Sequence, residues 1–322
     1  MIQFEVQVTN EDVNPLTHQR PMLSNVRMLL STIGEGYYIS KNVLDHTVAL
    51  TERFVFGEKY LKNRLKAYQG QKRVAFLYHG YFQTRAGFER LEDFLESPLF
   101  DVFAVSGGYQ PYSQDIRRSA EHEAKIFEYV MKNTDAEEVY LVGHSQGGLV
   151  ARYMTQKLGI TRKISKVITL ATPHQGSYAG VAGYAHKIAV SALGMVPGFP
   201  AIAGESGIQM IPGSRFLREL NALPLPPGIT WTSLYSYVDP LVWPPSYARM
   251  PYSEAQNILL KKIGHLAVLY NVQVYELILR TLLLTRRGER LDFGKLIDRD
   301  VLVMKRLERQ GQQIEEIVSS SD

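Results

Sequence analysis

Residues 138–148 read Glu-Val-Tyr-Leu-Val-Gly-His-Ser-Gln-Gly-Gly, and this stretch decides how the chain is expected to fold. Its first five residues form the short, mainly apolar run of a buried strand, and a helical pattern begins at Gly147. Ser145 lies between them, in the Gly-x-Ser-x-Gly pentapeptide of residues 143–147. A serine on a sharp turn between a strand and a helix is typical of a nucleophile, because the flanking glycines let other backbone approach closely.

Short apolar runs and longer helical patterns alternate along the chain on both sides of this stretch. The helical patterns cover residues 116–132 and 147–158. The runs that predict strands are residues 74–78, 102–106, 139–142, 167–171, 230–236 and 257–260. Nearly continuous apolar strands separated by helices indicate a parallel sheet that is covered on both faces. The predicted fold class is therefore α/β, with a mostly parallel, doubly wound sheet.

Two residues farther along the chain complete a catalytic set with Ser145. Between Ser145 and residue 265 there is one aspartate, Asp239, and after Asp239 there is one histidine, His265. Each follows a predicted strand, and the order serine, acid, histidine is the order that a strand-turn-helix nucleophile requires. The other acids considered for this role are interpreted as solvated surface residues: Glu205, Glu219 and Glu254. Ser145, Asp239 and His265 are therefore the predicted catalytic residues.

A tetrahedral oxyanion in such a reaction needs backbone N–H donors. One is expected from Gln146 at the start of the helix, where the helix dipole also favours negative charge. The second is expected from Tyr81, because His79 and Gly80 end the first core strand, where this donor lies. An ordinary glycine turn at the end of a strand is the alternative interpretation of Gly80. His174 precedes the acid in the chain, so we expect it to make a supporting hydrogen bond.

The chain from about residue 73 to 284 resembles bacterial lipases and esterases of the α/β-hydrolase superfamily, including relatives that deacylate lipid anchors. Five motifs in the correct order carry the resemblance: Leu77-Tyr-His-Gly80, Gly143-His144-Ser145-Gln146-Gly147, Thr169-Leu-Ala-Thr-Pro-His174-Gln-Gly176, Tyr235-Ser-Tyr-Val-Asp239-Pro-Leu-Val-Trp-Pro244 and Gly264-His265-Leu266. The resemblance implies the α/β-hydrolase fold, in which Gly143, His144 and Gly147 support the nucleophile turn. The chain departs from many relatives in the bulky pair Tyr81-Phe82, which is expected to narrow the acyl site.

Residues 176–213 form an apolar segment that interrupts the alternating pattern. They contain eight glycines, three prolines and only two charged residues, Lys187 and Glu205. In similar lipases this position often forms a mobile lid. The resemblance therefore implies a lid or cap inserted over about residues 176–228.

The two ends of the chain match none of these motifs. Residues 1–70 begin with a strand-like alternation and contain a plausible amphipathic helix between Val43 and Leu65. We expect this N-terminal extension to pack on a hydrolase domain that covers residues 71–284. Residues 285–322 carry many charges of mixed sign, as in a solvated tail or helix.

Composition excludes several other classes of protein. The chain of 322 residues has 36 Lys+Arg and 32 Asp+Glu, a formal charge of +4, and no basic block that would mark a nucleic-acid binder. The absence of cysteine excludes disulfides, thiolate metal sites and thiol catalysis. No acidic cluster or nucleotide-binding motif is found, so neither metal nor cofactor is expected. Without a signal peptide or an apolar run long enough to span a bilayer, a cytoplasmic protein is expected.

These residues predict hydrolysis of carboxylic esters, such as acyl lipids or similar apolar esters, through an acyl-Ser145 intermediate. The expected partner is a small-molecule or lipid ester, with transient contact to a lipid surface, and the oligomeric state is left open. The same catalytic residues serve acyltransferases, thioesterases, amidases and polyester depolymerases, and the pattern does not separate these activities. A non-catalytic lipid binder on the same scaffold is a further alternative.

Overall fold

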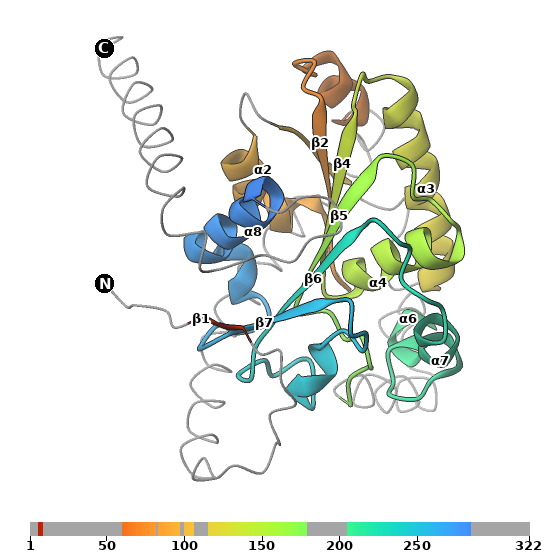
Figure 1. The fold of residues 1–322 in the computed structure, drawn as a ribbon, viewed down its shortest axis with the longest axis vertical. Helices are drawn as coiled ribbons and strands as arrows, with labels where there is room; N and C mark the ends of the chain where they lie inside the picture. The colour runs from red at the N-terminus through yellow and green to blue at the C-terminus, as the bar shows by residue number, and fades with distance from the viewer. Residues whose placement is uncertain are drawn as a thin grey trace, which may run out of the picture.

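The computed structural model describes residues 6–8, 60–81, 83–96, 100–105, 115–178 and 205–284. Within these residues the chain forms a seven-stranded sheet in the order β1-β7-β6-β5-β4-β2-β3. The strands are β1 (Val6–Val8), β2 (Arg73–Tyr78), β3 (Asp101–Val105), β4 (Glu138–His144), β5 (Ile164–Leu170), β6 (Thr230–Tyr235) and β7 (Gln256–Leu260). Neighbouring strands from β3 to β7 are parallel, and only β1 pairs antiparallel, at the edge beside β7 (Figure 1). The predicted mostly parallel α/β sheet is confirmed.

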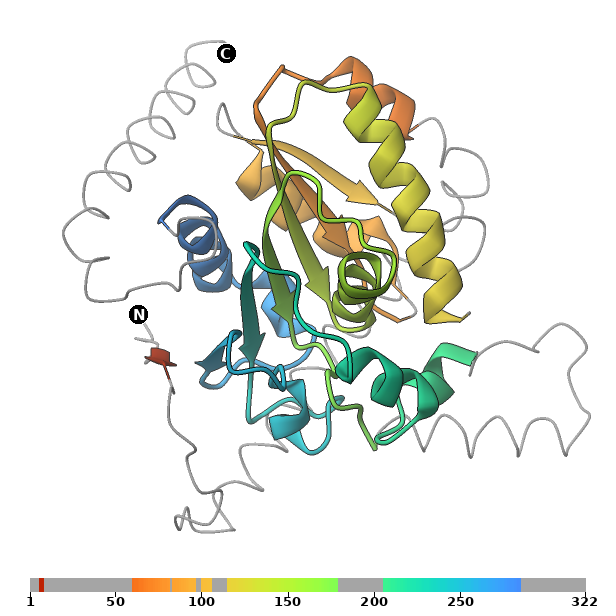
Figure 2. The ribbon, with the colours of Figure 1, turned by 45° about the vertical axis from the view of Figure 1, so that its right-hand side comes forward.

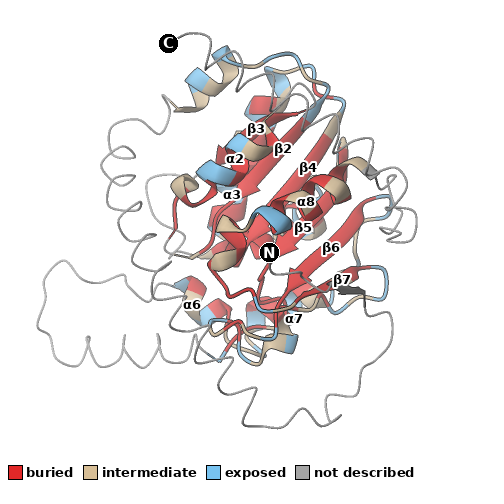
Figure 3. Cartoon of the chain, turned by 90° about the vertical axis from the view of Figure 1, so that its left-hand side faces the viewer, coloured by how far each residue is buried: buried red, intermediate tan, exposed pale blue. Residues whose placement is uncertain are grey.

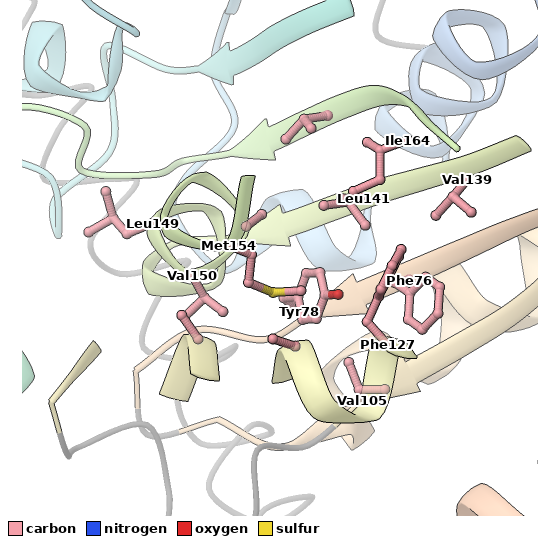
Figure 4. Packing of buried hydrophobic residues seen from close by; sticks show 14 of the residues in the cluster. Phe76, Tyr78, Val105, Phe127, Val139, Leu141, Leu149, Val150, Met154 and Ile164 are labelled. Carbon is pink, nitrogen blue, oxygen red and sulfur yellow. The ribbon is translucent and has the colours of Figure 1, made fainter. Parts of the chain in front are cut away.

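Alternate strand residues point to opposite faces of the sheet, and each face has its own hydrophobic core. In β2, Phe76 and Tyr78 belong to one core and Leu77 to the other. The ring of Phe76 packs at a tilt against that of Phe127 in α3, with the centroids 5.1 Å apart, and Met154 lies beside Tyr78 (Figure 4). Strands β2 to β7 are buried along most of their length, as Figure 3 shows, which is why their sequences are nearly continuous apolar runs.

Helices cover both faces of the sheet (Figures 1 and 2). Residues of α3 and α4 pack in the core on one face, and residues of α2 and α8 pack in the core on the other. The helical elements are η1 (Arg85–Phe88), α2 (Glu89–Leu95), α3 (Ile116–Lys132), α4 (Gln146–Arg152), η2 (Tyr153–Lys157), α6 (Glu205–Gln209), α7 (Arg215–Asn221), η3 (Pro245–Ala248), η4 (Ala267–Tyr270) and α8 (Val272–Leu284).

The helix predicted over residues 116–132 agrees with α3. The helix predicted over 147–158 begins one residue earlier, as α4, and then widens into a π-helical turn over Tyr153–Lys157. In that turn the Leu158 N–H donates to the carbonyl of Tyr153, five residues earlier in the chain. The hydrophobic periodicity of the sequence does not reveal this change in the hydrogen-bond pattern.

The strand predicted at the N-terminus is present as β1. Residues 60–66 are helical, and the rest of the helix proposed between Val43 and Leu65 lies outside the described residues. This short helix is held against α2, since Tyr60 Oη donates to Glu92 Oε1 at 2.6 Å and Arg64 Nη2 donates to Glu96 Oε1 at 2.8 Å.

Residues 179–204 and 285–322 also lie outside the described residues, and with them lie about half of the predicted lid and the whole charged tail. The division into extension, hydrolase domain and tail stays a prediction. In the part of the chain that the structure describes, no helix is both long enough and apolar enough to cross a bilayer.

Candidate active site

Ser145 is the single residue of the turn between β4 and α4. Its backbone has φ 52° and ψ −123°, in the left-handed half of conformational space that side chains rarely adopt. The Ser145 N–H donates to the carbonyl of Leu170 in β5 at 2.8 Å, which holds the strained residue in place. The side chain is thereby turned out at the carboxyl end of the sheet, and the residue is 8% exposed. Such strain at a polar residue is characteristic of a functional position.

Close approach of α4 to β2 explains Gly147 of the pentapeptide. A Cβ atom at Gly147 would collide with the carbonyl oxygen of Tyr78 and lie 2.6 Å from that of His79. At Gly143, a Cβ atom would lie 2.5 Å from the N atom of Gly148. Any larger residue would push the helix away from the strand end where Ser145 is presented.

Asp239 and His265 are in direct contact. Asp239 follows β6, His265 follows β7, and His265 Nδ1 lies 2.8 Å from Asp239 Oδ2. The other carboxylate oxygen of Asp239 accepts N–H groups from Leu241 at 2.8 Å and Val242 at 2.9 Å. Because the carboxylate only accepts, His265 Nδ1 carries the proton, and Nε2 of the neutral ring is left as the basic nitrogen.

The histidine loop lies beside the nucleophile turn. The ring centroid of His144, the residue before Ser145, is 4.9 Å from that of His265. His144 Nε2 lies 2.9 Å from the backbone carbonyl of His265, and His144 Nδ1 lies 2.8 Å from Gln83 Oε1. Burial, together with the repulsion that a protonated His265 would exert, holds the pKa of His144 well below its usual value. The neutral ring has one N–H and both neighbouring oxygens only accept, so one of these two contacts is a hydrogen bond at a time.

The loop after β2 lies against Ser145 from the other side. A Cβ atom at Gly80 would lie 2.9 Å from Ser145 Cβ and 3.1 Å from His144 Nδ1, so only glycine fits without displacement. His79 is fully buried, and its Nδ1 lies 3.0 Å from the Gly80 carbonyl. The next amide belongs to Tyr81, and the amide of Gln146 begins α4 at the same corner.

His174 lies in a second buried network behind α4. Arg152 Nη1 lies 3.3 Å from His174 Nδ1, and His174 Nε2 lies 2.9 Å from Thr169 Oγ1. Since arginine only donates, His174 Nδ1 accepts and Nε2–H donates to the threonine. Burial and the Arg152 charge hold the pKa of His174 well below its usual value.

Arg152 was not singled out from the sequence, although it is fully buried at the centre of this network. Burial lowers its pKa from 12.5 to about 10, so it remains a cation at neutral pH. Its hydrogen-bond partners among the described residues are neutral: Gln156, His174, Asn221 and Tyr252. A basic residue in an amphipathic helix gives no sequence signal of burial, because arginine is mostly exposed.

The two described ends of the apolar segment of residues 176–213 lie beside each other. Ser177 N–H donates to the carbonyl of Met210 at 2.8 Å, and Ser177 Oγ donates to the carbonyl of Leu241 at 2.8 Å. These bonds join the two ends of the segment to each other and tie the first end to the loop that carries Asp239. The acids set aside in the sequence lie exposed, and Glu219 Oε1 is 2.6 Å from Arg215 Nε.

No metal-binding cluster of three or more histidine or acidic side chains exists in the described parts of the chain. Gln83 was also missed by the sequence. It is 3% exposed, and it contacts Gly80 and, across 61 residues of sequence, His144.

Comparison with known proteins gives two kinds of match. The palmitoyl protein thioesterase family matches residues 75–197 by sequence. By structure, the chain is similar to Aspergillus fumigatus lipase B, with a TM-score of 0.51 and 19% identity over 70% of this chain and 56% of the lipase. It is also similar to the propeptide form of the Bacillus licheniformis lipase BlEst2, with a TM-score of 0.51 and 16% identity over 70% of this chain and 53% of that one.

The present chain therefore spans little more than half the length of these two lipases. A search among curated proteins found no significant match. The α/β-hydrolase fold expected from the sequence is confirmed. The family match is to thioesterases and these two structural matches are to lipases, so at this coarse level the chain resembles an ester hydrolase.

Proposed function

We propose that this protein is a serine hydrolase that cleaves carboxylic esters with apolar acyl groups through an acyl-Ser145 intermediate. The observation that carries the proposal is the 2.8 Å contact between Asp239 Oδ2 and His265 Nδ1, on a histidine loop that lies beside the turn of Ser145. A buried carboxylate that orients a histidine next to a strained serine is the arrangement that activates a hydroxyl for attack.

The first half of the reaction forms the acyl-enzyme. His265 Nε2 takes the proton of Ser145 Oγ as that oxygen attacks the ester carbonyl carbon. Asp239 keeps the Nδ1 proton in place and stabilises the imidazolium. The C–O bond to the alcohol then breaks, and the His265 proton passes to the leaving oxygen.

The second half releases the acid. A water molecule gives its proton to His265 Nε2 and attacks the acyl carbon, and Ser145 Oγ leaves with the proton from His265. In both halves the carbonyl oxygen becomes an oxyanion, which the amides of Gln146 and Tyr81 are proposed to bind. One such donor is worth about 3–4 kcal/mol of transition-state stabilisation.

The segment of residues 176–213 supports an apolar acyl group. It contains only two charged residues, its first end is bonded to the loop of Asp239, and its second end is bonded to the first. A mainly apolar cover over the acyl chain would remove apolar surface from water, which is worth about 25 cal/mol for each Å². We propose that this segment is the lid or cap of the active site.

A thioester is the second candidate substrate, because the family match over residues 75–197 is to palmitoyl protein thioesterases. The same attack by Ser145 would break a C–S bond and release a thiol. Rates of hydrolysis for p-nitrophenyl esters and for the matching acyl thioesters, measured on the purified chain over a range of acyl lengths, distinguish the two candidates.

Replacement of Ser145 tests the nucleophile. Ser145→Ala should abolish labelling by a fluorophosphonate probe and lower ester hydrolysis by roughly 10⁴-fold or more, because no acyl-enzyme can form. Ser119→Ala is the matched control, since Ser119 is also 8% exposed but lies in α3, where its Oγ donates to a backbone carbonyl. Labelling and activity that persist in Ser145→Ala would refute the proposal.

A further inference from the structure

Gln83 holds Gly80 at two points. Its side-chain Oε1 accepts a hydrogen bond from the Gly80 N–H at 2.8 Å, and its backbone N–H donates to the Gly80 carbonyl at 3.2 Å. Gln83 is 3% exposed, and its Oε1 also lies 2.8 Å from His144 Nδ1. Among the described residues the amide Nε2 of Gln83 has no hydrogen-bond partner, so the carbonyl half of the side chain makes these contacts.

The orientation of Gly80 decides where the next amide points. The Gly80 carbonyl and the Tyr81 N–H belong to one planar trans peptide group, so they point in opposite directions. Gly80 itself lies against the nucleophile, because a Cβ atom there would be 2.9 Å from Ser145 Cβ. A small rotation of Gly80 would therefore turn the Tyr81 N–H away from an oxygen bound at Ser145.

We propose that Gln83 is a positioning residue of the oxyanion hole: its side-chain carbonyl fixes Gly80 so that the Tyr81 N–H faces the developing oxyanion. The inference rests on the proposed function of Ser145 and adds a residue that does not itself touch the substrate. A polar anchor is needed here because glycine, chosen for its fit against Ser145, has no side chain that would hold the loop.

Gln83→Met tests this role. Methionine keeps the unbranched form of the side chain and removes the acceptor, while the backbone bond from residue 83 to Gly80 can remain. We expect kcat for a p-nitrophenyl ester to fall about 10- to 100-fold, with KM within about twofold, because the oxyanion donor acts in the transition state. Affinity for a boronic acid, which forms a tetrahedral adduct with the serine, should fall by the same factor as kcat/KM.

The matched control is Gln256→Met. Gln256 is also 3% exposed, but it begins β7 at the amino ends of the parallel strands, opposite the active site. Its replacement should leave kcat and boronic acid affinity within about twofold of the parent. Rates are divided by the number of fluorophosphonate-labelled sites, so that a partly folded sample does not imitate a slow enzyme. If Gln83→Met does not fold, Gln83→Leu takes its place.

Three outcomes would overturn the inference. These are an unchanged kcat in the Gln83 variant, an equal loss in Gln256→Met, or a rise in KM without a fall in kcat. Failure of the proposed function is seen separately, as activity that survives in Ser145→Ala. An inactive Ser145→Ala beside a fully active Gln83→Met would reject the positioning role alone.

Discussion

Two buried histidines lie near the carboxyl ends of the strands, one beside an anionic side chain and the other beside a cationic one. His265 lies 2.8 Å from the carboxylate of Asp239, and His174 lies 3.3 Å from the guanidinium of Arg152. A carboxylate stabilises an imidazolium, whereas a cation and burial together prevent one from forming. His265 is therefore suited to gain and lose a proton during a reaction, and His174 is suited to stay neutral and join structural elements. Burial alone does not distinguish the two residues, but the partner does.

The largest expected effect concerns the acidic partner. Asp239→Asn should lower kcat by about 10⁴-fold, because an amide N–H can face His265 Nδ1 and favour the tautomer with its proton on Nε2. Steady-state hydrolysis of a p-nitrophenyl ester measures the change. Asp101→Asn is the control, since Asp101 is also buried and accepts two backbone N–H groups, from Gln69 and Gln71, at the other end of the sheet.

A loss of less than about tenfold in Asp239→Asn would contradict the assignment of His265 as an oriented base. The contact with Asp239 would then not distinguish His265 from His174 in function.

The cationic partner should matter for stability. Arg152→Met leaves the acceptor on the buried His174 without its donor, and it also removes the donor to the half-buried Asn221 and Gln156. An orphaned buried acceptor costs about 1–3 kcal/mol, so we expect the free energy of unfolding to fall by about that amount, measured by urea denaturation. The kcat of each folded molecule should stay within about threefold, because no oxyanion donor or triad contact is removed.

A fall in kcat without a fall in stability would show instead that the Arg152 network acts on the chemistry. Arg152→Lys, which keeps the charge and loses the planar fork, should lie between Arg152→Met and the parent in stability.

The smallest expected effect is a dependence of stability on pH. The pKa of His174 is lowered in the folded state, so below about pH 6.5 this histidine binds a proton in the unfolded chain but not in the folded chain. Stability is therefore fully present above that pH and decreases as the pH falls. His174→Gln should make the decrease shallower, by at most about 1.4 kcal/mol for each pH unit. Urea unfolding at pH 7 and pH 5 measures the slope in both proteins, and equal slopes would place the proton elsewhere.

Sequence patterns predicted the parallel strands well, because strands buried on both faces are continuous apolar runs. β6 begins at Thr230, as expected, whereas β5 begins at Ile164, three residues before the predicted start. The earlier residues include Lys166, whose ammonium reaches the carbonyl of Leu282 at 2.8 Å and so lies buried in a strand. A lysine inside an apolar run looks like a strand boundary until its partner is known.

The candidate site divides in the same way. The sequence could single out Ser145, Asp239 and His265 as candidates because the strand-turn-helix pattern and the order of the three residue types are local or sequential properties. Gln83 and Arg152 have no such pattern around them. Gln83 reaches His144 across 61 residues of sequence, and Arg152 reaches Tyr252 across 100.

The sequence by itself determined the alternation of strands and helices, the place of the nucleophile turn and the chemical types available for catalysis. These follow from hydrophobic periodicity, from glycine at points of close contact and from residue order. Only the tertiary structure decided which carboxylate faces which histidine, which arginine is buried, and which glutamine holds the loop beside Ser145. Those choices depend on distances between segments far apart in the chain, and the strength and sign of an electrostatic contact are set by that distance and by burial.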